Sequence, residues 1–300
     1  MILEKKDLVS IVVCSYNQGK YIKECLDSVK AQTYPNIQLI VADDASPDNS
    51  VQVFENWLSE NNYPAITNFH QKNTGLATVL NECIELIEGK YVKIIAADDF
   101  LHPDSIQECV EKLESLGEDY GMVFSDTYAI DDNSNILPDI ADYDKLGSVP
   151  PETFKKDLLI GNRIAALTVL MKKEALIKTG KYKSDLLIED YYRWLKINAL
   201  YSTAYVPRKL AYYRLHDSNI SSARKERIDE ECLYLQMIFD KNGDIKGIIN
   251  YKIGKLYESN KLSDFLLTQF KEYPYKRRKL KLAVQYKIPA PLYKFLSKII

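Results

Sequence analysis

The segment Val9-Ser-Ile-Val-Val-Cys-Ser-Tyr-Asn17 is an apolar, β-branched run that ends in polar and aromatic side chains. Two later segments have the same form, namely Ile37-Gln-Leu-Ile-Val-Ala-Asp-Asp44 and Tyr91-Val-Lys-Ile-Ile-Ala-Ala-Asp-Asp99. Short apolar runs bounded by turn residues are typical of buried strands. The sequence therefore predicts strands over 9–14, 37–42 and 91–97, each followed directly by side chains that can carry chemistry.

Helical patterns lie between these strands. Apolar residues recur at spacings of three and four over 21–31 and 77–87, a proline opens a helix over 103–116, and strand-like runs lie at 65–69 and 121–128. This alternation predicts an α/β fold with a mainly parallel central sheet flanked by helices. Ligands of such sheets bind beyond the carboxyl ends of the strands, so we expect the clusters at 14–17, 43–46 and 98–99 to converge.

The second half of the chain has a different pattern. Residues 131–149 are polar and turn-rich, and we predict a helix over 152–160, a strand over 166–171 and a helix over 189–199. Residues 221–300 are helical in pattern and hold 17 basic against 9 acidic side chains, whereas residues 1–220 hold 23 against 33. We therefore predict one domain over 1–222 and a basic, helical C-terminal region over 223–300, with the boundary near Ser222.

Composition excludes several classes of protein. The 300 residues are 46% hydrophobic, which is enough for a substantial core, and a formal net charge of -2 argues against nucleic acid as a partner. The five cysteines are odd in number and have no Cys-x-x-Cys spacing, which indicates reduced core thiols in a cytosolic protein rather than a zinc site. Neither a targeting segment nor an apolar run of membrane-spanning length is found in the sequence.

Asp98 and Asp99 follow a buried strand directly. Adjacent carboxylates raise one another's pKa, and a divalent cation with oxygen ligands relieves this repulsion. Mg²⁺ or Mn²⁺ takes one or two protein carboxylates and completes its shell with water and phosphate oxygens, so a diphosphate ligand suits the pair. The alternative is that both aspartates are turn and cap residues before the helix that Pro103 opens.

The residues after the first two strands also allow two interpretations. Asp43 and Asp44 are placed to accept hydrogen bonds from a nucleobase or a ribose, or else to cap the chain at Ser50. Tyr16 either stacks on a base or is a partly buried loop aromatic. The chain has neither Gly-x-Gly-x-x-Gly after its first strand nor a P-loop motif, which disfavours dehydrogenases and P-loop enzymes.

Together these motifs resemble family 2 glycosyltransferases, which have the GT-A fold. The resemblance rests on Val9 to Asn17, on Ala31-Gln-Thr-Tyr-Pro-Asn-Ile-Gln-Leu-Ile-Val-Ala-Asp-Asp-Ala-Ser46, on Asn73-Thr-Gly75 and on Ile95-Ala-Ala-Asp-Asp99. It continues through Leu187-Ile-Glu-Asp-Tyr-Tyr-Arg-Trp194 and Tyr213-Arg-Leu-His-Asp-Ser-Asn-Ile-Ser221, and so covers about residues 8–222. One departure is Cys14, where several relatives have a threonine near the uracil.

The resemblance implies a role for each matching residue. It makes 1–130 a nucleotide-binding half, in which Asp44 bonds the uracil of a UDP-sugar, with Asp43 and the other donor-binding residues beside it: Ser15, Tyr16, Asn17, Asn73 and Gly75. Asp98 would hold the ribose or the donor sugar. Asp99 would coordinate the Mn²⁺ or Mg²⁺ ion that bridges the diphosphate.

The resemblance makes 131–222 the acceptor and catalytic half. Asp190 would be the general base of an inverting transfer, and His216 would reach the metal or the diphosphate, with a structural loop histidine as the alternative. Glu189 and Asp190 also suit a helix start, and both interpretations are compatible. Trp194 either flanks the acceptor or is a core residue.

Two arginines, the competing activities and the tail complete the sequence predictions. Arg163 and Arg214 either contact phosphates or form surface salt bridges. The resemblance implies a saccharide or lipid-linked saccharide acceptor in cell-surface polysaccharide synthesis. The alternatives are a non-catalytic sugar-nucleotide-binding scaffold and a glycoside hydrolase. Residues 271–300 hold nine basic side chains and one acid, Glu272, among apolar ones, which suits an anionic membrane at the inner face of the cell. Docking on its own domain or in a homodimer is the alternative.

Overall fold

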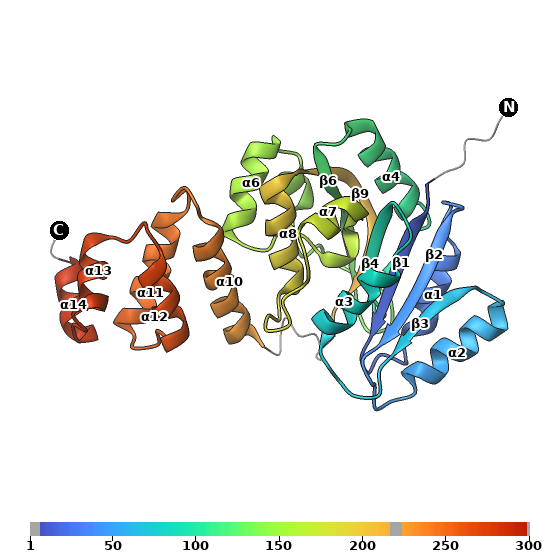
Figure 1. Ribbon diagram of the computed structural model, residues 1–300, viewed down its shortest axis with the longest axis horizontal. Coiled ribbons are helices and arrows are strands. Elements are labelled where there is room, and N and C mark those ends of the chain that lie inside the picture. Colours follow the sequence, from blue (N-terminus) through green and yellow to red (C-terminus); the bar gives the residue numbers. More distant parts are fainter. Residues whose placement is uncertain (1–6, 217–223, 299–300) are drawn as a thin grey trace. The chain divides into compact units, whose positions relative to one another are not determined.

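The computed structural model of the chain describes residues 7–216 and 224–298. They form two compact units (Figure 1). The first runs from the start of the sheet to Phe154 and resumes at Arg163, and the second contains Lys155–Asn162 and the C-terminal helices. The boundary predicted near Ser222 falls outside the described residues. The sequence prediction does not assign residues 155–162 to the C-terminal unit.

One sheet organises the first unit. Its strand order is β3-β2-β1-β4-β8-β6-β9-β5, and β7 pairs with β6. The strands are β1 (Val9–Ser15), β2 (Ile37–Asp43), β3 (Ala65–Phe69), β4 (Tyr91–Ala96), β5 (Phe100–Leu101), β6 (Tyr120–Ile130), β7 (Ile136–Leu137), β8 (Leu170–Lys172) and β9 (Ser202–Arg214).

The first four strands are parallel and in register. Cys14 of β1 lies opposite Ala42 of β2 and Ala96 of β4, so the carboxyl ends of these strands meet at one edge of the sheet. The runs of β1, β2 and β4 are nearly continuous and apolar because both faces of the sheet are covered, which leaves few positions for polar residues. The remaining strands are mixed: β8 is antiparallel to β4 and β6, and β9 is parallel to β6.

Helices cover both faces of the sheet. They are α1 (Ile22–Lys30), α2 (Ser50–Asn61), α3 (Leu76–Leu86), α4 (Ser105–Leu116), α5 (Tyr143–Gly147), α7 (Lys173–Lys178) and α8 (Glu189–Leu200), whereas α6 (Pro151–Ile160) begins in this unit and ends in the second. Val9, Ile11 and Val13 of β1 face a core shared with α1, α2 and α4, whereas α3 packs on the opposite face. The predicted α/β class with a flanked central sheet is confirmed.

Some predicted elements differ from the structure. The strand predicted over 166–171 is wrong at its start, because Ala166–Thr168 form a 3-10 turn and only Leu170–Lys172 are extended. Strand β9 is absent from the sequence prediction because Pro207, Arg208 and Lys209 interrupt its pattern, and its ladder with β6 is irregular there. Helix α2 is likewise absent from it, since Phe54 and Trp57 are its only large buried residues.

The second unit is helical. It contains α10 (Lys225–Phe239), α11 (Lys246–Glu258), α12 (Asp264–Glu272), α13 (Arg278–Gln285) and α14 (Ala290–Lys298), packed on a core of its own. The prolines at 289 and 291 separate α13 from α14, as the sequence predicts. Among the described residues, no helix has the length and apolar character needed to span a bilayer.

Lys93 is an unusual core residue. It lies on β4 with no exposed surface, and within the described parts of the chain its ammonium has no hydrogen-bond partner. Burial lowers the pKa of Lys93 to about 8, because desolvation disfavours the charged form. At neutral pH the folded protein therefore either buries an unpaired charge or releases a proton, and both cost free energy.

We expect Lys93→Met to stabilise the protein at pH 7. At higher pH the variant should be less stabilised relative to the wild type. Between pH 8 and 10.5 the unfolded lysine holds a proton that the folded one has lost, so wild-type stability rises with pH through this interval, by up to about 3 kcal/mol relative to the variant. Urea unfolding at pH 7 and pH 10.5 measures this, with Lys225→Met as the exposed control. A stability difference that does not change with pH would contradict the expectation.

Candidate functional site

The ends of β1, β2 and β4 are joined by hydrogen bonds. The amide of Asp44 donates to the carbonyl of Ser15 at 3.1 Å, and the amide of Ala97 donates to the carbonyl of Cys14 at 2.8 Å. The amide of Asn17 donates to the Ser46 hydroxyl at 2.7 Å. The three polar clusters predicted to converge therefore do so.

Ser15, the last residue of β1, and Tyr16, which follows it, face different surroundings. Tyr16 is 51% exposed, so its ring is accessible to a flat ligand. The Ser15 hydroxyl is buried and has no hydrogen-bond partner among the described residues. A buried hydroxyl without a partner is uncommon, and it marks this edge of the sheet as a place where a ligand can supply one.

Asp43 shapes the turn after β2. Its side chain is fully buried, and its oxygens accept hydrogen bonds from the amide of Ser46 at 2.7 Å and the Ser46 hydroxyl at 2.6 Å. The predicted contact of Asp43 with the donor is therefore not supported by its placement. Because Ser46 in turn binds Asn17, Asp43 contributes to the site through the turn that it fixes.

Asp44 holds the loop between β3 and α3. Its oxygens accept from the amides of Thr74 and Gly75, both at 2.7 Å, and from the Thr74 hydroxyl at 3.1 Å. Gly75 has φ +88°, a left-handed conformation that favours glycine. Asn73 is exposed on this loop. The Asn73-Thr-Gly75 segment is thus anchored on Asp44.

His70 connects Asp44 to helix α3. Its Nδ1 lies 3.1 Å from Asp44 Oδ1 and its Nε2 lies 2.6 Å from Glu82 Oε2. Burial alone would lower the pKa of His70, but the hydrogen bonds and charges of Glu82 and Asp44 outweigh it and raise the pKa. His70 is thus a bridge between the Asp44 carboxylate and helix α3.

Asp98 and Asp99 lie at the end of β4. Asp99 is 5% exposed, and burial together with the charge of Asp98 raises its pKa well above the usual range of a carboxylate. One Asp99 oxygen accepts from the amide of Arg214 at 2.9 Å. Asp98 is partly exposed, and its Oδ2 lies 3.0 Å from Nε2 of His216.

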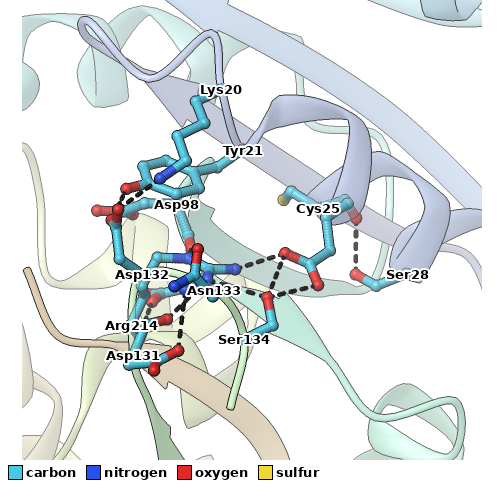
Figure 2. Close-up of polar contacts among 12 residues, drawn as sticks. Lys20, Tyr21, Cys25, Ser28, Asp98, Asp131, Asp132, Asn133, Ser134 and Arg214 are labelled. Atoms are coloured by element: carbon cyan, nitrogen blue, oxygen red, sulfur yellow. Dashed lines mark hydrogen bonds and ion pairs between the residues drawn. The ribbon is translucent and has the colours of Figure 1, made fainter.

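Arg214 is buried rather than placed at the surface. Its guanidinium donates to the carbonyls of Asp98 and Asp131, at 2.7 and 2.9 Å, and forms an ion pair with Glu24 (Figure 2). Neither of the predicted roles, phosphate contact or surface salt bridge, is supported by this placement. Arg163, in contrast, is exposed.

His216 is held against helix α1. Its ring stacks on Tyr21, with centroids 5.7 Å apart and planes 16° apart. The residues of the closing motif that follow, 217–221, lie outside the described residues. The structure therefore places the imidazole of His216 beside the Asp98 carboxylate, and the contact with a metal or a diphosphate stays a prediction.

Helix α8 begins with the acidic pair. Glu189 is its first residue, and Asp190 Oδ1 accepts from the amide of Tyr191 at 2.5 Å. A hydrogen bond with Cys83, burial and neighbouring charges, that of Glu189 among them, raise the pKa of the Cys14 thiol. Trp194 is buried, which favours the core alternative.

Sequence reasoning missed the residues that support Asp98 and Asp99. Tyr21, Glu24 and Ser134 surround the guanidinium of Arg214, and no local pattern indicates this. Tyr21 and Glu24 belong to the first turn of α1, where an aromatic and an acid one turn apart are ordinary. Only the strand and turn that bring Arg214 to them reveal their role.

Comparison with known sequences identifies the family. The profile of "Glycosyl transferase family 2" matches residues 10–175. The putative glycosyltransferase EpsH of Bacillus subtilis is 26% identical over 264 residues, which cover 86% of this chain and 71% of that protein.

Solved structures agree in fold. The crystal structure of residues 1–349 of S. aureus TarS, in complex with UDP-GlcNAc, is similar with a TM-score of 0.65 and 16% identity, covering 95% of this chain and 88% of that one. The mannosyltransferase PcManGT of Pyrobaculum calidifontis, in complex with GDP-Man and Mn2+, is similar with a TM-score of 0.62 and 17% identity over 98% and 88%. The predicted GT-A fold is confirmed, and the chain is a glycosyltransferase that belongs to glycosyl transferase family 2.

Proposed function

We propose that the protein is an inverting, divalent-metal-dependent glycosyltransferase that moves a sugar from a UDP-sugar to an acceptor hydroxyl. The observation that carries this proposal is the pair of Asp98, which lies beside His216, and the buried Asp99, at the same sheet edge as the anchored loop of Asp44. PcManGT supports metal use, since it is described in complex with Mn2+, and TarS supports a UDP-sugar donor.

The donor atoms at this edge fit a hard dication. They are carboxylate oxygens with one imidazole nitrogen, which suit Mn²⁺ or Mg²⁺. Within the described residues no group of three or more His, Cys, Asp or Glu side chains is arranged to hold an ion. We propose that Asp99 holds the cation, with His216 near it, and that the donor diphosphate supplies its other ligands. When bound, the cation would stabilise the negative charge of the departing UDP.

Asp44 has capacity left for the nucleobase. Its Oδ2 accepts one hydrogen bond, from Gly75, and a carboxylate oxygen can accept two. The imide N–H of uracil is a donor that matches this vacancy, and Tyr16 is exposed beside it for stacking. The loop over 73–75 would then close on the base that Asp44 binds.

Asp190 is the proposed general base. It lies in the first turn of α8, where the helix N-terminus fixes its position. It would remove the proton of the acceptor hydroxyl as that oxygen attacks the anomeric carbon from the face opposite UDP, which inverts the configuration. Glu189 and the exposed Arg163 are proposed to lie near the acceptor or the phosphates.

The acceptor and the cellular site are further parts of the proposal. We propose a saccharide or lipid-linked saccharide acceptor in cell-surface polysaccharide synthesis, and contact of the tail with the inner face of the cell membrane. Leu282, Tyr286, Leu292 and Phe295 are exposed, by 39, 67, 49 and 63%. Arg277, Arg278, Lys281, Lys287 and Lys294 take part in no ion pair among the described residues, which leaves their charges available to anionic lipid.

A nucleotide-sugar panel tests the donor. We expect UDP-sugars with Mn²⁺ to raise the melting temperature by a few degrees, because a ligand at one hundred times its Kd adds about 2.7 kcal/mol of stability. The shift should vanish with EDTA and in Asp99→Asn. A preference for GDP- or CMP-sugars would refute the role of Asp44.

Asp190→Asn tests the base with the donor so identified. We expect the transfer rate to fall by about 10²- to 10⁴-fold, the usual contribution of a general base, while Mn²⁺-dependent UDP binding is retained. Release of UDP in the presence of acceptor measures the rate. Asp185→Asn, in the exposed loop before α8, is the matched control. A wild-type rate in the Asp190 variant would overturn the assignment.

Vesicle flotation tests the tail. We expect the protein to float with vesicles of phosphatidylcholine and phosphatidylglycerol but not with phosphatidylcholine alone, and binding to fall with salt. The double variant Tyr286→Ser and Phe295→Ser should lose binding, whereas Tyr251→Ser, which changes a 61% exposed residue of α11, should keep it. Equal binding of both variants, or none by the wild type, would exclude this surface.

A further inference from the structure

We infer that Arg214 is a positioning residue that fixes the Asp98–Asp99 turn for the metal-bound donor, with Glu24 as its counter-ion. The inference rests on the proposed function, because it assigns a role in holding the proposed metal and donor site. It concerns residues other than those that bind the donor, since neither Glu24 nor the side chain of Arg214 is expected to touch the donor.

The contacts of Arg214 reach both aspartates. Its Nε donates to the carbonyl of Asp98 at 2.7 Å, and its backbone amide donates to Asp99 Oδ1 at 2.9 Å. One residue thus fixes the main chain of Asp98 and the carboxylate of Asp99. The side chain is 1% exposed, so its position is set by protein contacts rather than by solvent.

The other side of the guanidinium binds two further segments. The NH1 group donates to the carbonyl of Asp131 at 2.9 Å and to the hydroxyl of Ser134 at 3.0 Å, both in the turn after β6. The NH2 group pairs with Glu24 of α1, and Glu24 also accepts from the Ser134 hydroxyl at 2.8 Å. Arg214 therefore joins α1, the turn after β4, the turn after β6 and the end of β9, as Figure 2 shows.

Aromatic rings enclose the same guanidinium. Its Cζ lies 4.6 Å from the ring centre of Tyr21 and 5.9 Å from that of Phe100. Tyr21 also stacks on His216 and bonds Asp132 through its hydroxyl. The ring that packs on Arg214 thus orients the imidazole beside Asp98. Arg214 and its partners, Glu24, Tyr21 and Ser134, which we call the clamp, therefore support both sides of the proposed metal site.

The charge of Arg214 is already compensated. Glu24 is 43% exposed and supplies the carboxylate, while carbonyl oxygens take up other N–H groups. A phosphate-binding arginine needs its fork of N–H groups directed at the ligand, and Glu24 would compete with that ligand. The two roles therefore make opposite predictions for removal of Glu24.

The test is Glu24→Gln, with Glu108→Gln as its matched control. Glu108 pairs with Arg208 on α4 and β9, so the same change is made to an arginine ion pair that does not touch Asp98 or Asp99. We expect Glu24→Gln to weaken Mn²⁺-dependent binding of UDP about 10- to 100-fold, the usual effect of removing a residue that orients a metal ligand. Glu108→Gln should bind as the wild type does.

A second readout needs neither metal nor donor. Amide hydrogen exchange of the ligand-free protein should be faster in Glu24→Gln at residues 98–101 and 131–135, and unchanged there in Glu108→Gln. Arg214→Lys, which keeps the charge but loses the fork, should match Glu24→Gln in both measurements.

Two results overturn the inference. They are UDP binding by Glu24→Gln that equals or exceeds that of the wild type with Mn²⁺, and exchange at 98–101 that the substitution leaves unchanged. Failure of the proposed function is distinguishable, because the wild type itself would then show no Mn²⁺-dependent UDP binding while the exchange experiment still tests the clamp.

Discussion

Burial of carboxylates at one edge of a sheet is the constraint on which this structure depends. Asp43, Asp44 and Asp99 are each 5% exposed or less, and a buried carboxylate is costly unless hydrogen-bond donors or cations compensate it. The cost of burial is offset in a different way for each aspartate. Asp43 is bound within its own turn and Asp44 by a loop and a histidine, whereas Asp99 accepts one hydrogen bond among the described residues, from the amide of Arg214, and lies in the field of the Arg214 charge.

Asp99 differs from Asp44 because the cost of burying its carboxylate is only partly offset. Asp44 has donors on both oxygens, whereas Asp99 has one donor and a like charge beside it, which raises its pKa. A group held in its unfavoured state by its surroundings gains most from a cation. The same sheet edge thus combines Asp44, whose two oxygens both accept from a loop, with Asp99, which has fewer donors and is suited to taking a metal.

The sequence predicts this edge well because its strands are continuous apolar runs. Strands β1, β2 and β4 end within one residue of their predicted ends, and the polar residues after them are forced to one side by parallel pairing. Strand β9 is harder to predict, since polar residues and a proline interrupt it. The burial of Arg214 is harder still, because its partners come from segments 80 to 190 positions away in the chain.

The two buried cationic side chains, Lys93 and Arg214, differ in whether other groups compensate their charge. Lys93 and Arg214 are both almost wholly buried, yet the ammonium of Lys93 has no partner in the described chain, whereas Arg214 has a counter-ion, carbonyls and two rings. A lysine can escape the cost by losing its proton, which its lowered pKa shows, but an arginine cannot. A buried arginine therefore requires a set of fixed partners, and fixed partners are what a turn that carries two adjacent carboxylates needs.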